Sequence, residues 1–598
     1  MVNERLLKTI SIFSFVLITV AIALIYNSQA AGYEASIYAS TPILAWISLI
    51  LSLGCGIYVA VSSLFSRGAN NRFPILGVSI AAFSTVVILL VFALRGYYAL
   101  NVRGDIGEHL SLVYYVLAHG SASQLDYYPL THYYVAALYD FTGISIIDIF
   151  GYLPAFFEVL YMAAIFLLAT TVLPRKEQAI LATLAGIPLL HDFYLMLTPN
   201  ALLVLVFPFV TYVILRSLDR RALSFTLLAV ILVVFLAVLH PLGALTLAIL
   251  LFGLWLFQRF KAPFKGSELS LKKFKIDQNL MVLSAITFFG WIIHFEAYGV
   301  TINNVLTQFN SNETYAARLA TTADAAQAVG YNIYEQFLKL WTGTAIYLTL
   351  SLIAFVLVWR GLSRGKDLVR LKGLLGGTCL VVAVFMPFLF VNAIVSPFRI
   401  LASVLTLSAV FVGFVLFEFN EWLISFKRHG KTVGVVVACV LLIGVSVNGI
   451  LYLYPSTFTL AGTIQTTHAE VDGNYWFLLN RIPDLGILGL YYAPYRFSYL
   501  LPAVNESTQP YLSPSSIQNV PWHLGYNNYT HMGEAVKNDT YVVFSEQSKR
   551  WYVDVYPELA SVRIQPQDFS RMDNDTTLNK LYTNGGFDVW YLTAQPPP

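Results

Sequence analysis

The sequence predicts an all-α polytopic membrane protein with about 13 transmembrane helices, followed by a soluble α/β domain at the C-terminus. Hydrophobic residues make up 57% of the 598 residues, and charged residues only 12%. Many apolar runs reach about 20 residues, the length that a helix needs to cross a bilayer. Near residue 454 these runs stop, and turns, prolines and polar residues replace them.

The apolar runs define a transmembrane domain over residues 1–454. The first run follows Arg5 and Lys8 and has no small-residue cleavage site behind it, so we expect a retained span rather than a signal peptide. The predicted spans are 7–27, 42–65, 73–95, 151–173, 177–197, 199–217, 222–239, 241–259, 279–298, 340–360, 372–394, 398–420 and 432–454. Two long loops interrupt them, 96–150 and 299–339.

Basic residues indicate the orientation of these spans. With thirteen crossings, the Lys and Arg clusters of the short loops all fall on the side of the N-terminus, which is therefore expected to be cytoplasmic. The loop 96–150 and the C-terminal domain are then extracytoplasmic. Five glycosylation sequons fall on that outer side, at Asn312, Asn505, Asn528, Asn538 and Asn574. The chain is expected to be a multi-pass protein of the cell membrane, in contact with membrane lipids.

Residues 455–598 are predicted to form the extracytoplasmic α/β domain. An amphipathic helix is expected from His468 (HAEVDGNYWFLLNRI), and buried strands are expected at ILGLYY, YVVFS and DVWYL. The three cysteines all lie inside apolar runs, so no disulfide framework is indicated. An outer domain without disulfides fits an archaeal cell surface better than a eukaryotic secretory lumen.

The chemistry is expected in the segment Arg103–Tyr139, where charged and aromatic residues gather between apolar runs. Asp105, Glu108 and His109 share one face if this segment is helical. His119, Asp126, His132 and several tyrosines follow them. Charged groups beside membrane spans are costly unless they have a function. The alternative is a solvated loop that only connects two spans.

Two short motifs in this segment resemble the GT-C superfamily, polytopic glycosyltransferases that use polyprenyl-phosphate-linked sugars. Gly104-Asp105, followed by Glu108 and His109, is similar to the Gly-Asp start of the first outer loop in glucosyltransferases that extend lipid-linked oligosaccharides. Residues 126–131 (DYYPLT) resemble the Asp-Tyr-Pro-Pro-Leu-Thr stretch of those enzymes, with a tyrosine in place of the first proline. The resemblance implies a GT-C fold with an acidic active-site residue in the 96–150 loop.

A second GT-C group gives a partial match. Asp105-x-x-x-His109 resembles the Asp-Pro-Tyr-Tyr-His loop of archaeal oligosaccharyltransferases, whose Trp-Trp-Asp-Tyr-Gly signature is missing from the C-terminal domain here.

Transfer of a sugar from a lipid phosphate needs a base for the acceptor hydroxyl and a cation for the departing phosphate. Asp105 is the candidate catalytic base, and its alternative use is a helix cap. Glu108 and His109 are expected to orient the base or the sugar, or else to be ordinary loop residues.

Arg399, at the outer start of an otherwise uncharged span, is the candidate phosphate ligand, because guanidinium groups bind phosphate bidentately. The alternative for Arg399 is interfacial snorkelling.

Several further residues are candidates for substrate binding at the same membrane face. Asp192, His240 and His294 could line the donor cavity, and His132 in the loop is a further candidate for substrate binding, although a buried, hydrogen-bonded histidine is the usual alternative. Asp126 could contribute too, but it precedes Tyr-Tyr-Pro, where an aspartate commonly forms an Asx turn or a helix cap. No cluster has the spacing of a metal site, although Asp105, Asp126 and Asp192 could hold Mg²⁺ or Mn²⁺ if they converge.

Together these features lead us to expect transfer of a sugar from a polyprenyl (dolichyl) phosphate-linked donor to a lipid-linked glycan or another acceptor on the outer face. One alternative is an oligosaccharyltransferase or another protein glycosyltransferase. A second alternative is a membrane transporter or flippase, and a third is a scaffold that displays the C-terminal domain. No motif for nucleic-acid or nucleotide binding is present.

Overall fold

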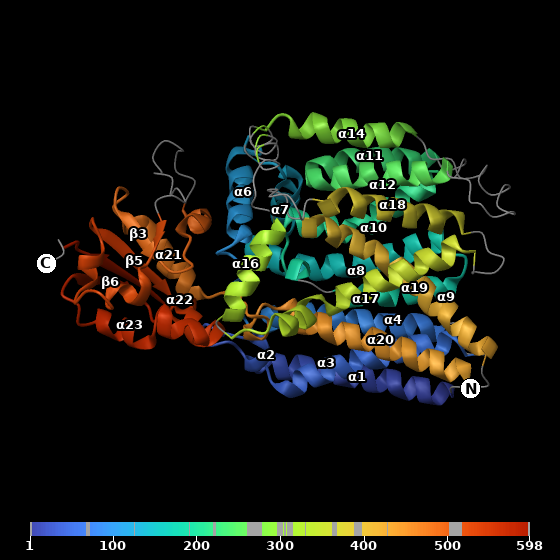
Figure 1. Cartoon of the computed structure of the whole chain (residues 1–598), viewed down its shortest axis with the longest axis horizontal. Coiled ribbons are helices and arrows are strands. Elements are labelled where there is room, and N and C mark those ends of the chain that lie inside the picture. The colour runs from blue at the N-terminus through green and yellow to red at the C-terminus, as the bar shows by residue number, and fades with distance from the viewer. Residues whose placement is uncertain are drawn as a thin grey trace.

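The computed structural model describes residues 3–595, apart from 67–71, 125, 190–191, 219–222, 260–277, 296–298, 300–302, 304–306, 308–314, 329, 362–367, 388–396, 427–428 and 502–516. It combines a bundle of long apolar helices with a C-terminal region, residues 455–595, that contains a mixed sheet (Figure 1). The C-terminal region lies at one end of the bundle, and the N-terminus lies at the other (Figure 1).

Long helices cover the predicted spans. They are α1 (Glu4–Tyr26), α3 (Ile43–Leu64), α4 (Arg72–Leu89), α8 (Ile146–Val172), α9 (Lys176–Gly186), α10 (Pro199–Ser217), α11 (Leu223–Leu239), α12 (Pro241–Arg259), α14 (Gln278–Ile292), α17 (Ile333–Trp359), α18 (Val369–Phe385), α19 (Pro397–Phe426) and α20 (Gly430–Leu453). Among the described residues, 8 helices are long and apolar enough to cross a membrane. The predicted class, a polytopic α-helical membrane protein with a small C-terminal sheet, is confirmed.

Two predicted spans are not single helices. Residues 73–95 form α4 and the short α5 (Val91–Leu94), with a break at Leu90. Residues 177–197 were expected to form a single helix, but α9 ends at Gly186 and two short 3₁₀ helices follow, η1 (Ile187–Leu189) and η2 (Asp192–Leu195). Pro188 explains the break, because proline has no N–H and its ring clashes with the carbonyl four residues earlier. The prediction of one unbroken span was wrong at both positions.

Helices α3 and α4 approach each other closely through small residues. A Cβ atom on Gly77 would lie 2.4 Å from the backbone nitrogen of Ala60, and one on Gly56 would lie 2.8 Å from the backbone nitrogen of Ala81. On each helix a glycine is followed four residues later by an alanine, Gly56 and Ala60 on α3 and Gly77 and Ala81 on α4. Such spacing brings backbones together in membranes, where packing rather than the hydrophobic effect drives helix association.

The C-terminal region contains a five-stranded sheet in the order β4-β3-β5-β7-β6. Strand β3 is parallel to β4 and β5, whereas β7 is antiparallel to β5 and β6. The elements of this region include β2 (Gln465–Thr466), α21 (His468–Asn480), β3 (Gly486–Gly489), β4 (Ile517–Asn519), β5 (Thr540–Ser545), α22 (Glu546–Arg550), α23 (Pro566–Met572), β6 (Leu578–Thr583) and β7 (Phe587–Leu592). The predicted helix and all three predicted strands are present as α21, β3, β5 and β7.

Shorter elements lie between the long helices along the chain. They are α2 (Ile37–Ser40), α5 (Val91–Leu94), β1 (Ala99–Leu100), α6 (Asp105–His119), α7 (Pro129–Thr142) and α16 (Tyr315–Ala328). Strand β1 pairs with β2 in an antiparallel ladder, with Ala99 opposite Thr466. Three residues further on, Arg103 forms an ion pair with Glu470 of α21. The loop that leads into α6 is thus fastened to the C-terminal region.

We predict that Gly77→Ala destabilises the protein by about 1–3 kcal/mol, the usual cost of overpacking, because the added methyl group meets backbone atoms of α3. Thermal unfolding in detergent measures this effect. Gly444→Ala in α20 is the matched control, because no atom lies within 4 Å of the position of its Cβ. Equal melting temperatures for the two variants would contradict the close approach of α3 and α4.

Candidate functional site

Two helices from the 96–150 loop carry four of the eight predicted site residues. Helix α6 begins with Asp105 directly after Gly104 and places Asp105 and Glu108 in its first turn, where the helix dipole favours negative charge. It ends at Gly120, whose φ of 69° is left-handed and suits glycine. Helix α7 begins with Pro129 and also ends at a left-handed glycine, Gly143. These signals explain why the loop folds into two short helices.

The carboxylates of Asp105 and Glu108 are exposed and share one cation. Their side chains are 60% and 63% exposed. Arg496, from the 3₁₀ helix η5 (Pro494–Leu500) of the C-terminal region, forms an ion pair with Glu108, and its Nη2 lies 3.6 Å from Oδ1 of Asp105. Asp105 does not act as the N-cap of α6, because Gly104 occupies that position.

A buried hydrogen-bonded chain lies behind these carboxylates. Nδ1 of His132 donates to Oδ2 of Asp126 at 2.6 Å, and Nε2 of His132 lies 2.9 Å from Nδ1 of His109. When both imidazoles are neutral, His109 Nδ1–H donates a hydrogen bond to His132 Nε2, which leaves Nε2 of His109 as an unprotonated acceptor. The relay of Asp126, His132 and His109 thus presents a neutral base on the same helix as Asp105.

Burial determines the protonation state of His109. Desolvation holds the pKa of His109 well below its usual value of 6.5, and the neighbouring His132, Arg496 and His240 lower it further. His109 is therefore neutral at physiological pH.

Tyr128 connects the loop to the membrane bundle. Its ring stacks on that of His240 with centroids 4.9 Å apart and planes inclined by 15°. Burial raises the pKa of the Tyr128 hydroxyl, and the charge of Arg399 opposes this effect, whereas Asp105 and Glu108 add to it. The charges of both acidic residues and of Arg399 therefore act on the same aromatic side chain.

Among the described residues, the Nδ1 of His240 and the guanidinium of Arg399 have no hydrogen-bond or ion-pair partner on the bundle side of the site. His240 is buried immediately before α12, and its Nδ1 has no hydrogen-bond partner. Arg399, in the first turn of α19, is exposed. Within the described part of the chain it makes no hydrogen bond or ion pair, while its charge acts on His240. A buried ring nitrogen and a neighbouring cation without a counter-ion form an environment that suits an anion.

The remaining predicted residues behave differently. Asp126 forms the expected Asx turn, because its Oδ1 accepts from the backbone N–H of Tyr128 at 2.8 Å. Its second oxygen bonds His132, so Asp126 is a buried structural partner rather than a group that faces a substrate. The backbone of Asp192 begins η2, but its side chain lies outside the described residues. His294, at the end of α14, is exposed.

The side chain of Asp192 lies outside the described residues, so the structure does not test whether Asp105, Asp126 and Asp192 converge on a cation. Both oxygens of Asp126 accept hydrogen bonds within the loop, from the N–H of Tyr128 and from His132. Among the described residues, no three His, Cys, Asp or Glu side chains form a group that could hold a metal ion.

Sequence reasoning missed Arg496. Its segment, YAPYRFSYL, carries no motif, and 391 residues separate it from Asp105 in the chain (496 − 105). A lone arginine among aromatic residues is the only local signal that could have drawn attention to it.

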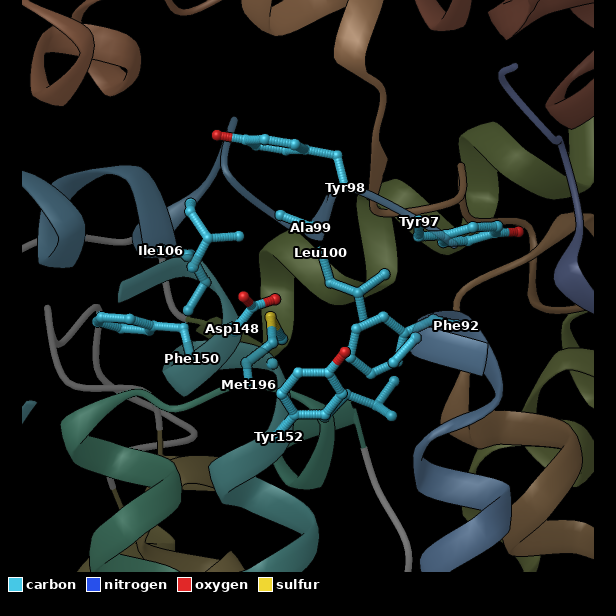
Figure 2. A pocket seen from close by; sticks show the side chains of 14 residues that line it. Phe92, Tyr97, Tyr98, Ala99, Leu100, Ile106, Asp148, Phe150, Tyr152 and Met196 are labelled. Atoms are coloured by element: carbon cyan, nitrogen blue, oxygen red, sulfur yellow. The ribbon is translucent and has the colours of Figure 1, made fainter. Parts of the chain in front are cut away.

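A separate cavity lies beside the start of α6, where Ile106 contributes to its wall. Figure 2 shows its aromatic lining, which includes Phe92, Tyr98 and Tyr152, and the carboxylate of Asp148. None of the predicted site residues lines this cavity. The titratable cluster described above is therefore distinct from it.

We predict that the relay makes the protein less stable in mild acid. The unfolded chain takes up a proton at His109 near pH 6.5, whereas the folded chain does so only at lower pH, so stability falls as the pH drops below about 6.5. In His109→Gln, the loss of melting temperature between about pH 7.5 and 5.5 should be smaller than in the wild type. His119→Gln, at the exposed end of α6, is the control and should follow the wild type. Identical pH dependence in His109→Gln would contradict this prediction.

No family model and no curated protein matches the chain. Among solved structures, the apo oligosaccharyltransferase of Archaeoglobus fulgidus is similar with a TM-score of 0.45 and 11% identity, over 86% of this chain and 75% of the other. ArnT from Cupriavidus metallidurans bound to undecaprenyl phosphate gives 0.44 and 11%, over 93% of this chain and 100% of the other. The apo form of that ArnT gives 0.44 and 12%, over 86% and 100%.

Proposed function

We propose that this chain is a GT-C type glycosyltransferase. It would move a sugar from a polyprenyl (dolichyl) phosphate-linked donor to a lipid-linked glycan or another acceptor on the outer face of the membrane. One observation carries this proposal: the exposed carboxylates of Asp105 and Glu108 and the cation of Arg399, which has no ion-pair partner among the described residues, act on one side chain, Tyr128, at one end of an apolar helical bundle. A lipid substrate can reach this position from the bilayer, and a polar acceptor can reach it from water.

Asp105 is suited to accept the proton of the acceptor hydroxyl. Its carboxylate is exposed at the start of α6, so it can contact an acceptor that approaches from outside the membrane. As the acceptor oxygen forms a bond to the anomeric carbon, the bond from that carbon to the phosphate oxygen breaks, and the proton passes to Asp105. The neutral Nε2 of His109 lies on the same helix and supplies a hydrogen-bond acceptor for a sugar hydroxyl.

Arg399 is suited to bind the phosphate that departs. The leaving group gains negative charge as the sugar is transferred, and a guanidinium stabilises this charge through paired N–H donors. His240, whose Nδ1 has no partner, lies close enough to interact with Arg399 and stacks on Tyr128. These three side chains would form the phosphate subsite.

A protein acceptor would require the same chemistry, so the oligosaccharyltransferase alternative differs only in what the C-terminal region recognises.

A transporter or flippase is favoured by one observation. Glu158 is buried within α8, and neither of its carboxyl oxygens has a hydrogen-bond partner in the part of the chain that the structure describes. Ionisable groups inside membrane helices often belong to transport pathways. A transporter, however, would not need the exposed carboxylates at the end of the bundle.

We predict that Asp105→Asn lowers sugar transfer at least about a hundredfold, because it preserves shape but removes the proton acceptor. The assay uses purified protein, a set of polyprenyl-phosphate sugars and lipid-linked or peptide acceptors. Asp140→Asn is the control, since Asp140 is an exposed aspartate of the neighbouring helix α7. Near-normal transfer by Asp105→Asn would refute the assignment of the base, and an inactive wild type would refute the enzyme class.

We also predict that the 96–150 loop and the C-terminal region share the extracytoplasmic side. In a background without the three native cysteines, Ser121→Cys and Ser561→Cys should both react with an impermeant thiol reagent in intact cells. Lys176→Cys, at the exposed first residue of α9, should react only after the cells are lysed. Labelling of Lys176→Cys in intact cells, or of only one of the two serine positions, would contradict this orientation.

A further inference from the structure

The C-terminal region packs directly against the helix that carries Asp105. The 3₁₀ helix η5 runs along the face of α6 formed by Gly107, Ser111 and Tyr114, which are spaced by four and three residues. A Cβ on Gly107 would lie 2.1 Å from the carbonyl oxygen of Arg496, so only glycine allows this approach. One helical turn further, the side chains of Ser111 and Ser498 hydrogen-bond at 3.0 Å.

This packing determines where the guanidinium of Arg496 lies. Tyr114 and Tyr499 stack with centroids 6.3 Å apart, which continues the contact between η5 and α6. Arg496 itself is only 18% exposed, and its guanidinium lies 5.1 Å from the centroid of the Tyr495 ring. Its position is therefore set by the backbone and by packing, and not only by its charge.

Arg496 compensates two like charges. Asp105 and Glu108 lie three residues apart on α6, so their carboxylates repel each other. The guanidinium interacts with both, at 3.6 Å from Asp105 and in direct contact with Glu108. An exposed ion pair of this kind contributes little to stability. The identity of its partners, the two carboxylates of the proposed site, points instead to a role in the reaction.

A second contact holds the other side of the α6 N-terminus. Arg103 forms an ion pair with Glu470, and its Nη2 donates to the carbonyl oxygen of Gln465 at 2.6 Å. The backbone N–H of Asn101 donates to the carbonyl oxygen of Ile464 at 2.6 Å. Residues of the C-terminal region thus hold the chain before Asp105, while η5 holds the helix after it.

We propose that Arg496 is a positioning residue for the transfer reaction, contributed by the C-terminal region. It holds the carboxylates of Asp105 and Glu108 in one geometry, so the active site is complete only when η5 is docked on α6. This inference rests on the proposed glycosyltransferase function and assigns the C-terminal region a part in catalysis, beyond recognition of the acceptor.

The first test is Arg496→Gln, which removes the charge but retains a polar side chain of similar length. We expect kcat to fall at least about tenfold while the Kd for a polyprenyl-phosphate sugar stays unchanged, because misplacement of a catalytic group affects the chemical step. Arg496→Lys should recover part of kcat. Arg550→Gln removes an arginine of the same region that pairs with Asp554 away from α6, so it serves as the control. If Arg496→Gln keeps full kcat and the wild type is active, the inference about Arg496 is overturned, whereas the proposed glycosyltransferase function is not.

A crosslink tests whether η5 must stay docked. The hydroxyl oxygens of Ser111 and Ser498 lie 3.0 Å apart, so a Ser111→Cys/Ser498→Cys pair can form a disulfide in a background without the native cysteines. We expect the oxidised protein to transfer sugar as fast as its reduced form. Loss of activity on oxidation, with recovery on reduction, would overturn the proposal, because it would show that η5 must leave α6 during turnover. An inactive wild type would refute the proposed function and, with it, the role of Arg496.

Discussion

The arrangement of the site depends on the contact between η5 and α6. Helix α6 carries Asp105, Glu108 and His109, and it packs mainly against η5 and α7 at the end of the bundle (Figure 1). Gly107 lets the backbone of η5 approach to a distance that any side chain at that position would prevent. This contact places Arg496 beside the two carboxylates. The C-terminal region therefore holds the helix that carries Asp105, Glu108 and His109, whereas the relay partners of His109, Asp126 and His132, come from the segment around α7.

Two kinds of polar environment meet at this end of the bundle. On the outer side, exposed carboxylates are paired with an arginine that is largely covered, so the negative charges remain accessible while their repulsion is reduced. On the bundle side, Arg399 has no counter-ion within the described residues, and the buried ring nitrogen of His240 has no hydrogen-bond partner. One side therefore suits a hydroxyl group that must lose a proton, and the other suits an anion at the end of a lipid.

Much of this fold could be predicted from local patterns. Apolar runs located the long helices, and the start and stop signals around α6 and α7, such as Pro129 and Gly143, lie where helices begin and end. The break after Gly186 was missed because hydropathy alone does not register the effect of Pro188 within an apolar run. In the C-terminal region, α21 and the strands β3, β5 and β7 are the most apolar segments and were predicted correctly, whereas the exposed strands β4 and β6 were not.

The site was predictable only in part, for a physical reason. Asp105, Glu108 and His109 are neighbours on one helix, so their spacing alone brought them together. The bond between His132 and His109 depends on how α7 packs against α6, and the contact of Arg496 depends on a fold that brings distant segments together. Single-sequence reasoning contains no information on such contacts. It also could not distinguish Asp126, whose two oxygens are both hydrogen-bonded, from a carboxylate that is free to bind a substrate.

The most direct test of the account is a structure of the purified protein with a polyprenyl phosphonate sugar, a donor analogue that cannot be cleaved at the sugar. The account predicts that the phosphonate lies within hydrogen-bonding distance of the Arg399 guanidinium, with the anomeric carbon of the sugar facing Asp105. A lipid head group bound elsewhere, with Arg399 and Asp105 both free of contact, would contradict it.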